Sequence, residues 1–201
     1  MRRWRQRRIR SRPWSDVDCW VLDLEMTGLD PTRDRIVAVG MVPVRHRAVH
    51  VGERFFSMVG GDGPRGAGVT VHHLLPAQLM DAPPLEEVVA EIDRRLRDAV
   101  LVVHARSVDM PFLQRAYRQS GRPWPDPPVV DTLALLRRHE RHRLVHEPAE
   151  TAVPTHLSAA RALFSLPAHD VHDALSDAIA TAELLLALAQ RLGARTVGDL
   201  V

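Results

Sequence analysis

The chain has one cysteine and contains neither lysine nor asparagine among its 201 residues. A single thiol, Cys19, excludes an internal disulfide and a zinc site built from thiolates. Lysine and asparagine are encoded by A-rich codons, so their absence indicates a GC-rich, bacterial genome. Together these features predict a protein of the reducing cytoplasm.

Long apolar runs are missing as well. The longest strongly apolar stretch, residues 184–189, is far shorter than the ~20 residues that cross a bilayer, so we expect no membrane partner. The first residues also lack the apolar stretch of a secretory signal. Because they are rich in arginine and poor in acids, a mitochondrial transit peptide stays open as an alternative.

Positive charge is distributed unevenly along the chain. All 27 basic side chains are arginine, and seven of them lie within residues 2–12, where there is no acid. The other 20 face 25 acidic side chains, so a basic leader precedes an acidic body. This asymmetry predicts an anionic partner, with a disordered solubilising tail as the alternative. We assign residues 1–15 to a flexible leader and 16–201 to one domain.

The pattern of the body predicts an α/β fold. Apolar, partly alternating runs at 19–24, 35–44 and 51–59, separated by turn-forming residues, indicate three antiparallel strands. Strands at 100–103 and 129–130 then alternate with stretches of helical spacing. Strands followed by strand–helix alternation favour a mixed sheet flanked by helices.

Acids stand at several strand ends and helix starts, where α/β sheets place their sites. Asp23 and Glu25 end the first strand, and residues two apart on a strand point to the same face. Asp109 follows a second buried strand, and Asp177 opens the last helix, five residues after His172. Like charges held close together are unfavourable unless a cation lies between them. Helix capping or a solvated helix face is the alternative role for Asp109 and Asp177.

Three segments carry a family resemblance: DLEMTGLDP at 23–31, HARSVDMPFL at 104–113 and HDALSDAIAT at 172–181. They resemble the three motifs of the DnaQ-like, or DEDDh, 3′–5′ exonucleases, and the chain is similar to their proofreading branch, the epsilon subunits of DNA polymerase III. The resemblance spans about residues 17–192. It implies a ribonuclease H-like fold with a five-stranded mixed sheet, three strands antiparallel and then parallel strands.

The resemblance also implies roles for individual residues. The acids that would hold two divalent ions, Mg²⁺ or Mn²⁺, are Asp23, Glu25, Asp109 and Asp177. His172 would be the general base. The residues assigned to the substrate are Met26, Thr27, Leu29 and His104, with Leu29 wedged against the last base.

The chain departs from the family pattern at three positions. The second motif usually has Asn after its His and Phe before its Asp, where this chain has Ala105 and Val108. Asp173 stands where a basic residue is common, which places a negative charge beside His172. None of the three replaces an acid of the motifs.

The leading hypothesis is a metal-dependent 3′–5′ exonuclease that releases nucleoside 5′-monophosphates from single-stranded DNA ends. A DNA polymerase or another repair protein is its expected partner. DLEMTGLDP is also similar to oligoribonuclease, so RNA and oligoribonucleotides are the alternative substrates. An inactive nucleic-acid-binding or polymerase-partner module is the third hypothesis. Histidines at 139, 142 and 146 indicate a solvated helix face, with a zinc site as the alternative.

Overall fold

The computed structural model describes residues 2–60, 81–144 and 153–201. The strands are β1 (Cys19–Met26), β2 (Ile36–Arg45), β3 (Ala48–Val49), β4 (Phe55–Met58), β5 (Val100–Val103) and β6 (Val129–Asp131). The helices are α1 (Arg2–Arg10), α3 (Leu85–Leu96), α4 (Arg106–Gln119), α5 (Thr132–Leu144), α6 (Leu157–Ala162) and α7 (Ala174–Arg191). Short 3-10 turns cover Trp14–Asp16, Val51–Glu53 and Val197–Asp199. None of the described helices is long and apolar enough to cross a membrane.

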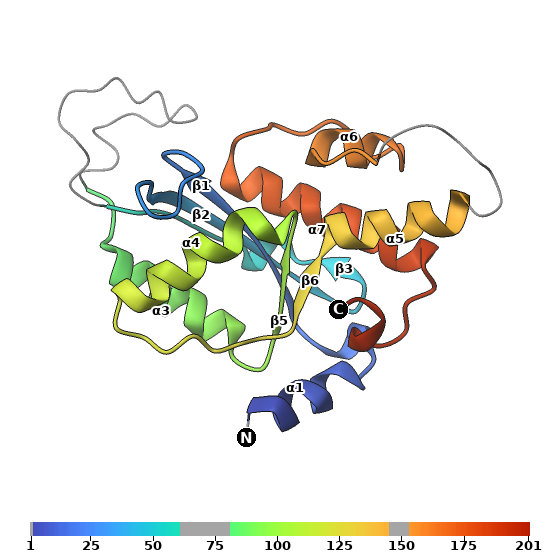
Figure 1. The fold of residues 1–201 in the computed structure, drawn as a ribbon, viewed down its shortest axis with the longest axis horizontal. Coiled ribbons are helices and arrows are strands. Elements are labelled where there is room, and N and C mark those ends of the chain that lie inside the picture. Colours follow the sequence, from blue (N-terminus) through green and yellow to red (C-terminus); the bar gives the residue numbers. More distant parts are fainter. Residues whose placement is uncertain (1, 61–80, 145–152) are drawn as a thin grey trace.

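The strands form one mixed sheet in the order β3-β2-β1-β5-β6, and β4 also pairs with β2. β2 runs antiparallel to β1, β3 and β4, whereas β5 is parallel to β1 and to β6. Figure 1 shows this sheet between the pair α3–α4 and a layer of α5, α6 and α7. The predicted ribonuclease H-like architecture, antiparallel first and then parallel, is confirmed.

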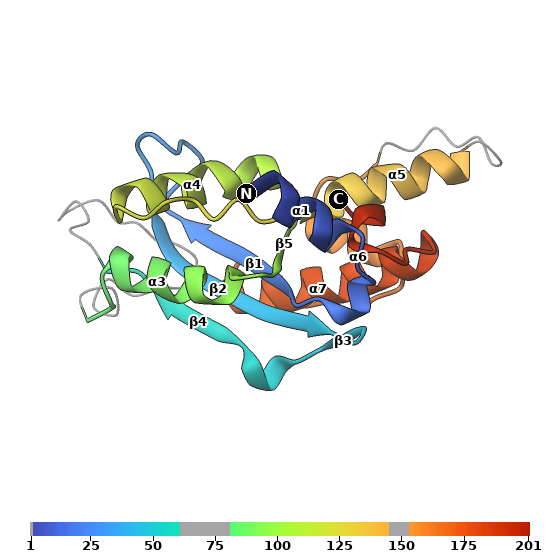
Figure 2. The same ribbon diagram turned by 90° about the horizontal axis from the view of Figure 1, so that it is seen from below.

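The outer edge of the sheet is divided between β3 and β4, opposite Pro43 (Figure 2). Pro43 accepts a hydrogen bond from the His50 backbone N–H at 2.9 Å, but it has no N–H to return. The 3-10 turn Val51–Glu53 lies in this interval. The strand that we expected over 51–59 is therefore shorter, and a separate two-residue strand precedes it.

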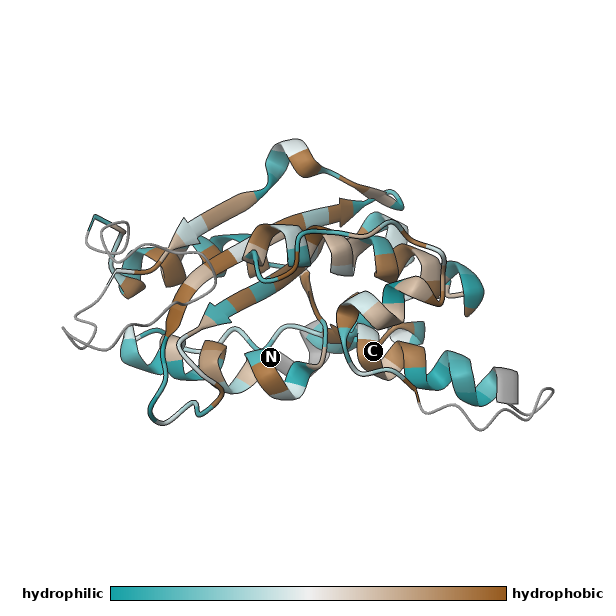
Figure 3. Cartoon of the chain, turned by 90° about the horizontal axis from the view of Figure 1, so that it is seen from above, coloured by the Kyte–Doolittle hydropathy of each residue, from teal (hydrophilic) through white to brown (hydrophobic). Residues whose placement is uncertain are grey.

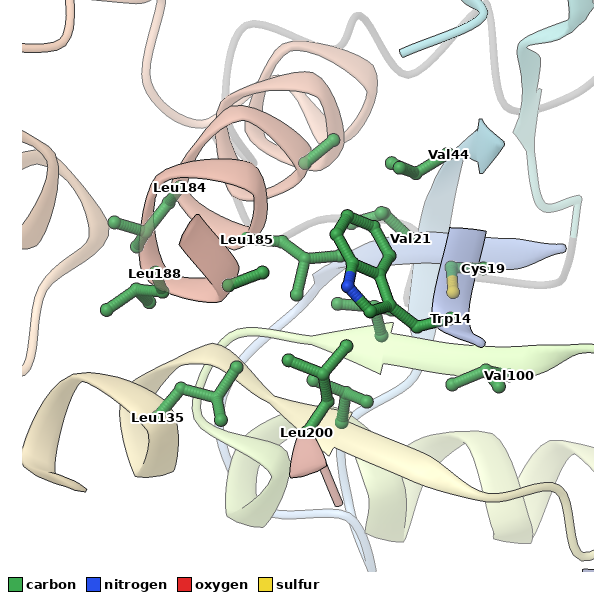
Figure 4. Packing of buried hydrophobic residues seen from close by; sticks show 14 of the residues in the cluster. Trp14, Cys19, Val21, Val44, Val100, Leu135, Leu184, Leu185, Leu188 and Leu200 are labelled. Carbon is green, nitrogen blue, oxygen red and sulfur yellow. The ribbon is translucent and has the colours of Figure 1, made fainter. Parts of the chain in front are cut away.

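Apolar side chains fill both faces of the sheet. On β1, Cys19 and Val21 lie in the core on the α7 side, whereas Trp20 and Leu22 pack toward α3 and α4. Figure 4 shows Cys19 and Val21 near Leu185 of α7. This alternation along β1 decides which way the next residues of the strand point.

The arginine-rich segment is helical over α1, and the residues around its end contact the body. Ile9 and Trp14 are buried in the α7-side core. The indole N–H of Trp14 donates to the carbonyl oxygen of Ala194 at 3.0 Å, and Pro13 pairs with Thr196. The segment is thus attached beside the C-terminal residues (Figure 1). Its assignment as a flexible leader stays a prediction.

The histidines considered as zinc ligands are not gathered in the described part of α5. His139 lies near Glu140 and the ring of Phe164, whereas His142 is exposed. His146 lies outside the described residues. Figure 3 shows that the outer turns of α5 are hydrophilic, which agrees with a solvated helix face.

Candidate active site

Two carboxylates end β1 on the face that α7 covers. Cys19 and Val21 point into the α7-side core, and the two-residue alternation carries Asp23 and Glu25 to the same side. Glu25 is buried and Asp23 is partly exposed. The two acids therefore continue the inner row of β1 beyond the apolar core.

Helix α7 reaches these acids because β2 carries a glycine beside them. Gly40 is the partner of Asp23 in the β1–β2 ladder. A Cβ atom at Gly40 would collide with the carbonyl group of Ala174, the first residue of α7. The start of α7 therefore rests directly on the strand backbone, an approach that any side chain at this position would obstruct.

This close approach brings a third acid to the pair on β1. Asp177 lies in the first turn of α7, and oxygen atoms of Asp23, Glu25 and Asp177 lie within 4.8 Å of one another. An all-oxygen, negatively charged set of ligands fits a hard divalent ion such as Mg²⁺ or Mn²⁺. Across residues 2–60, 81–144 and 153–201, this is the group whose ligand atoms are close enough to hold one ion.

The fourth acid, Asp109, is buried in the first turn of α4. The start of that helix is held by Asp131 at the end of β6. The Asp131 carboxylate accepts hydrogen bonds from the backbone N–H groups of Ala105 and Arg106 at 3.0 and 3.2 Å. It also accepts one from Leu133 at 3.0 Å, at the start of α5. Asp131 thus sets the direction of α4, and with it the place of Asp109.

Negative charge accumulates in the cluster. Burial, together with the charges of Asp109, Asp177 and Glu25, holds the pKa of Asp23 well above its usual range. Burial, with a contribution from Asp177, raises the pKa of Glu25 to about 7. Burial also raises the pKa of Asp109 to about 8. The acids therefore favour a proton in the protein alone, and a divalent cation among them would favour their charged forms instead.

Both oxygens of Asp177 accept hydrogen bonds from the loop before α7. His169 donates from Nε2 to Oδ1 at 2.8 Å, and the backbone N–H of His172 donates to Oδ2 at 3.1 Å. The His169 side chain is only 9% exposed. The sequence did not point to His169. It lies in a loop, and loop residues follow no periodicity that would show whether the His169 side chain points toward Asp177.

His172 occupies the turn that leads into α7. Its φ of 66° is in the left-handed region, which is uncommon for a residue other than glycine. The charge of protonated His172 lowers the pKa of Glu25, which places the imidazole near that carboxylate. The unusual Asp173 caps the helix, since its carboxylate accepts the Ser176 N–H at 2.7 Å.

His104 uses both ring nitrogens within the protein. Nδ1 lies 2.8 Å from the Thr132 hydroxyl oxygen, and Nε2 donates to the carbonyl oxygen of Thr155 at 3.1 Å. Burial lowers the pKa of His104, which favours the neutral ring. The side chain therefore joins the end of β5 to α5 and to the segment before α6. Its role toward substrate stays a prediction.

The residues expected to meet a terminal nucleotide follow β1 directly. Met26 packs partly against the α3–α4 core. The Thr27 hydroxyl donates to Asp34 at 3.0 Å, which closes the loop after β1. Leu29 is 78% exposed at the outside of this loop, so its side chain is open to a base.

Comparison with known proteins agrees with this geometry. Residues 20–185 match a family model, RNase_T, that is described as Exonuclease. The chain is 34% identical over 184 residues to a DNA polymerase III subunit epsilon-like protein of Rhodobacter capsulatus, covering 87% of this chain and 24% of that protein. It is 30% identical over 129 residues to a PolC-type DNA polymerase III of Bacillus cereus, covering 62% of this chain and 9% of that protein. The chain thus spans about a quarter or less of these two relatives.

A solved structure gives the same fold at low sequence identity. Escherichia coli exonuclease I in complex with a dT13 oligonucleotide superimposes with a TM-score of 0.71 at 14% identity. The match covers 89% of this chain and 42% of that chain. At this identity the likeness describes the arrangement of strands and helices only.

Proposed function

Because the chain belongs to the RNase T/DnaQ-like exonuclease family, of the DEDD type, we propose that it is a metal-dependent 3′–5′ exonuclease acting on single-stranded DNA ends. It releases nucleoside 5′-monophosphates. The observation that carries the proposal is the gathering of Asp23, Glu25 and Asp177 within 4.8 Å, from two elements far apart in the sequence. Asp109 adds a fourth acid whose charge acts on Asp23.

The chemistry of the acids suits Mg²⁺ or Mn²⁺, and we infer a pair of ions. Asp23, Glu25 and Asp177 would hold them, and Asp109 would support them from α4. When bound, the pair supplies an activated water and stabilises the leaving oxygen. Four carboxylates alone would repel a phosphodiester, so the cluster is suited to an anionic substrate only with cations present.

His172 serves as the general base in this proposal. It lies in the loop before α7, and its charge acts on the carboxylate of Glu25. A neutral imidazole nitrogen can accept a proton from the attacking water, which is the role of a general base. Exposed Leu29 stacks on the terminal base, a contact that does not depend on sequence.

DNA is favoured as the substrate by the relatives. The names of two refer to DNA polymerase III, and a solved neighbour holds a dT13 strand. The same names support a DNA polymerase as the partner. RNA is the second candidate, favoured by the DLEMTGLDP segment at the end of β1.

Release of 5′-monophosphates from uniformly labelled DNA and RNA 20-mers, with Mg²⁺, Mn²⁺ or EDTA, tests the proposal. We expect release from DNA with either ion and none in EDTA. Asp23→Asn should lower the rate by at least about 100-fold, because it removes a ligand of the ions. Asp81→Asn, at an exposed acid outside the cluster, is the matched control. Undiminished release by Asp23→Asn would refute the proposal, and faster release from RNA would favour the second candidate.

A further inference from the structure

Exposed arginines gather at the end of the sheet opposite the carboxylates. We name this group the arginine surface. Its members come from α1, from position 12 just after α1, from the turn between β2 and β3, and from the C-terminal segment. They are Arg7, Arg8, Arg10, Arg12, Arg47 and Arg195.

Trp14 lies beneath part of the arginine surface, next to Arg47 and Arg195. The Arg47 guanidinium lies 5.7 Å from the centroid of the Trp14 ring, and the Trp14 backbone N–H donates to the carbonyl oxygen of Arg195. Residues from three distant parts of the sequence therefore meet here. Because Trp14 itself is buried, its surroundings form a fixed part of the body.

Helix α1, which carries three of these six arginines, is attached to the body by several contacts. Ile9 is buried in the core, and the Gln6 amide donates to the Asp126 carbonyl and carboxylate at 2.8 and 3.0 Å. The Val197 N–H donates to the Arg12 carbonyl oxygen at 3.0 Å. Contacts on both sides of α1 thus hold its arginines in place, unlike those of a freely solvated tail.

Three exposed acids lie beside the arginine surface. Asp199, the acid of the adjacent 3-10 turn, accepts hydrogen bonds from the backbone N–H groups of Arg195 and Thr196 at 2.9 and 2.7 Å. Asp126 accepts a hydrogen bond from the Gln6 amide, and Arg12 donates to the backbone carbonyl of Asp16. Six arginines against these three carboxylates leave an excess of positive charge.

We propose that the arginine surface binds the phosphate backbone of the substrate strand, upstream of the 3′ end that enters the site. This rests on the proposed function. Arginine binds phosphate through a planar, bidentate fork, and each contact releases condensed counterions without reading the bases. The chemistry of the surface thus suits a strand of any sequence.

The length of β1 sets the length of strand that the surface can engage. Asp23 and Glu25 are the fifth and seventh of the eight residues of β1, so Glu25 lies about 20 Å along the strand from Cys19 at ~3.3 Å per residue, and the arginine surface lies beyond Cys19. At ~3.4 Å per stacked nucleotide, about six nucleotides cover that distance. A strand bound at the acids must therefore be longer than a tetranucleotide to reach the arginine surface, and a 20-mer is long enough.

Anisotropy of 5′-labelled dT4 and dT20 in EDTA tests the surface apart from catalysis. We expect Arg7→Gln/Arg10→Gln to weaken dT20 binding about tenfold and to reduce the salt slope by about 1.4, at ~0.7 per contact on a single strand. Arg7→Lys/Arg10→Lys should keep most of the affinity. Arg54→Gln/Arg118→Gln removes the same charge from exposed positions elsewhere and should change nothing.

Turnover separates this inference from the proposed function. With Mg²⁺, Arg7→Gln/Arg10→Gln should raise KM for dT20, leave kcat unchanged and leave dT4 unaffected. If the wild type cleaves DNA but the variant matches the Arg54→Gln/Arg118→Gln control, the inference fails alone. If nothing is cleaved but dT20 binding still depends on Arg7 and Arg10, the proposed function fails and the phosphate-binding surface stands. A polyglutamate 20-mer is the test of anion type. If it binds as tightly as dT20 and its binding also depends on Arg7 and Arg10, the surface is not specific for nucleic acid and the proposal is overturned.

Discussion

His169 Nε2 lies 2.8 Å from Oδ1 of Asp177, while the backbone N–H of His172 donates to Oδ2 of the same carboxylate. The loop before α7 thus holds both oxygens of an acid that also faces Asp23 and Glu25. A shift of this loop would turn the Asp177 carboxylate, and a turn of Asp177 would move the loop. The position of His172 and the shape of the acid cluster are therefore linked.

Removal of the His169 contact should weaken metal binding. His169→Ala leaves Oδ1 of Asp177 without its donor, so we expect a 10–100-fold loss of Mn²⁺ affinity, as for other residues that orient ligands. His169→Gln keeps an N–H donor and should recover most of the affinity. Calorimetric titration with Mn²⁺ measures both variants. Wild-type affinity in His169→Ala would show that Asp177 is oriented without it.

The contact between Gly40 and α7 predicts a steric effect on stability. Gly40→Ala places a Cβ against the Ala174 carbonyl group, so α7 must move from the strand. We expect the free energy of unfolding in urea to fall by about 1–3 kcal/mol, as for overpacked cores. Gly52→Ala is the matched control, because no atom lies within 4 Å of its added Cβ. Equal stability of the two variants would mean that α7 can withdraw without cost.

The raised pKa values of the acids predict that the metal-free protein loses stability as pH rises. The pKa values of Glu25 and Asp109 rise from the ordinary 4.5 and 3.8 to about 7 and 8 in the folded protein. At pH values between the ordinary and the raised pKa, the folded state binds more protons than the unfolded chain. Raising the pH through this range therefore favours unfolding. In EDTA, the Tm should fall between pH 5 and pH 8.

Two changes should weaken this dependence of Tm on pH. Mg²⁺ or Mn²⁺ favours the charged carboxylates, so the Tm gain from either ion should be larger at pH 8 than at pH 5. Asp109→Asn removes one titrating group and should flatten the fall in EDTA, whereas Asp81→Asn should not. A pH-independent effect of the ions would argue against binding at these acids.

The left-handed backbone of Ala105 predicts a stabilising substitution. Its φ is 58°, where a Cβ is unfavourable but asparagine is tolerated, and the related exonuclease motif usually has Asn here. Ala105→Asn should therefore raise the free energy of unfolding by about 0.5–1 kcal/mol. Ala105→Val, with a branched side chain, should lower it. Urea denaturation compares the two, and a destabilised Asn variant would contradict the argument.

Local pattern in the sequence was enough to predict much of the fold. The apolar runs located β1 and β5, and the two-residue period of β1 put Asp23 and Glu25 on one face before any tertiary contact was known. Side-chain direction along a strand is a local property, which is why it can be read from spacing. The family motifs added Asp109, Asp177 and His172 as candidates. The sequence also contains Pro43, but it does not show which neighbouring strands pair with β2 on either side of that proline.

Tertiary structure decided the rest of the site. Asp177 meets the β1 acids because Gly40 admits α7, and Asp109 is placed through the hydrogen bonds that Asp131 makes to the start of α4. His169 had no sequence signal, because loop residues follow no period. The sequence alone thus determined the acids and their motifs, with the direction of the first two. Contacts between residues distant in the chain decided that Asp23, Glu25 and Asp177 lie within 4.8 Å of one another, since only packing sets how closely a helix approaches a sheet.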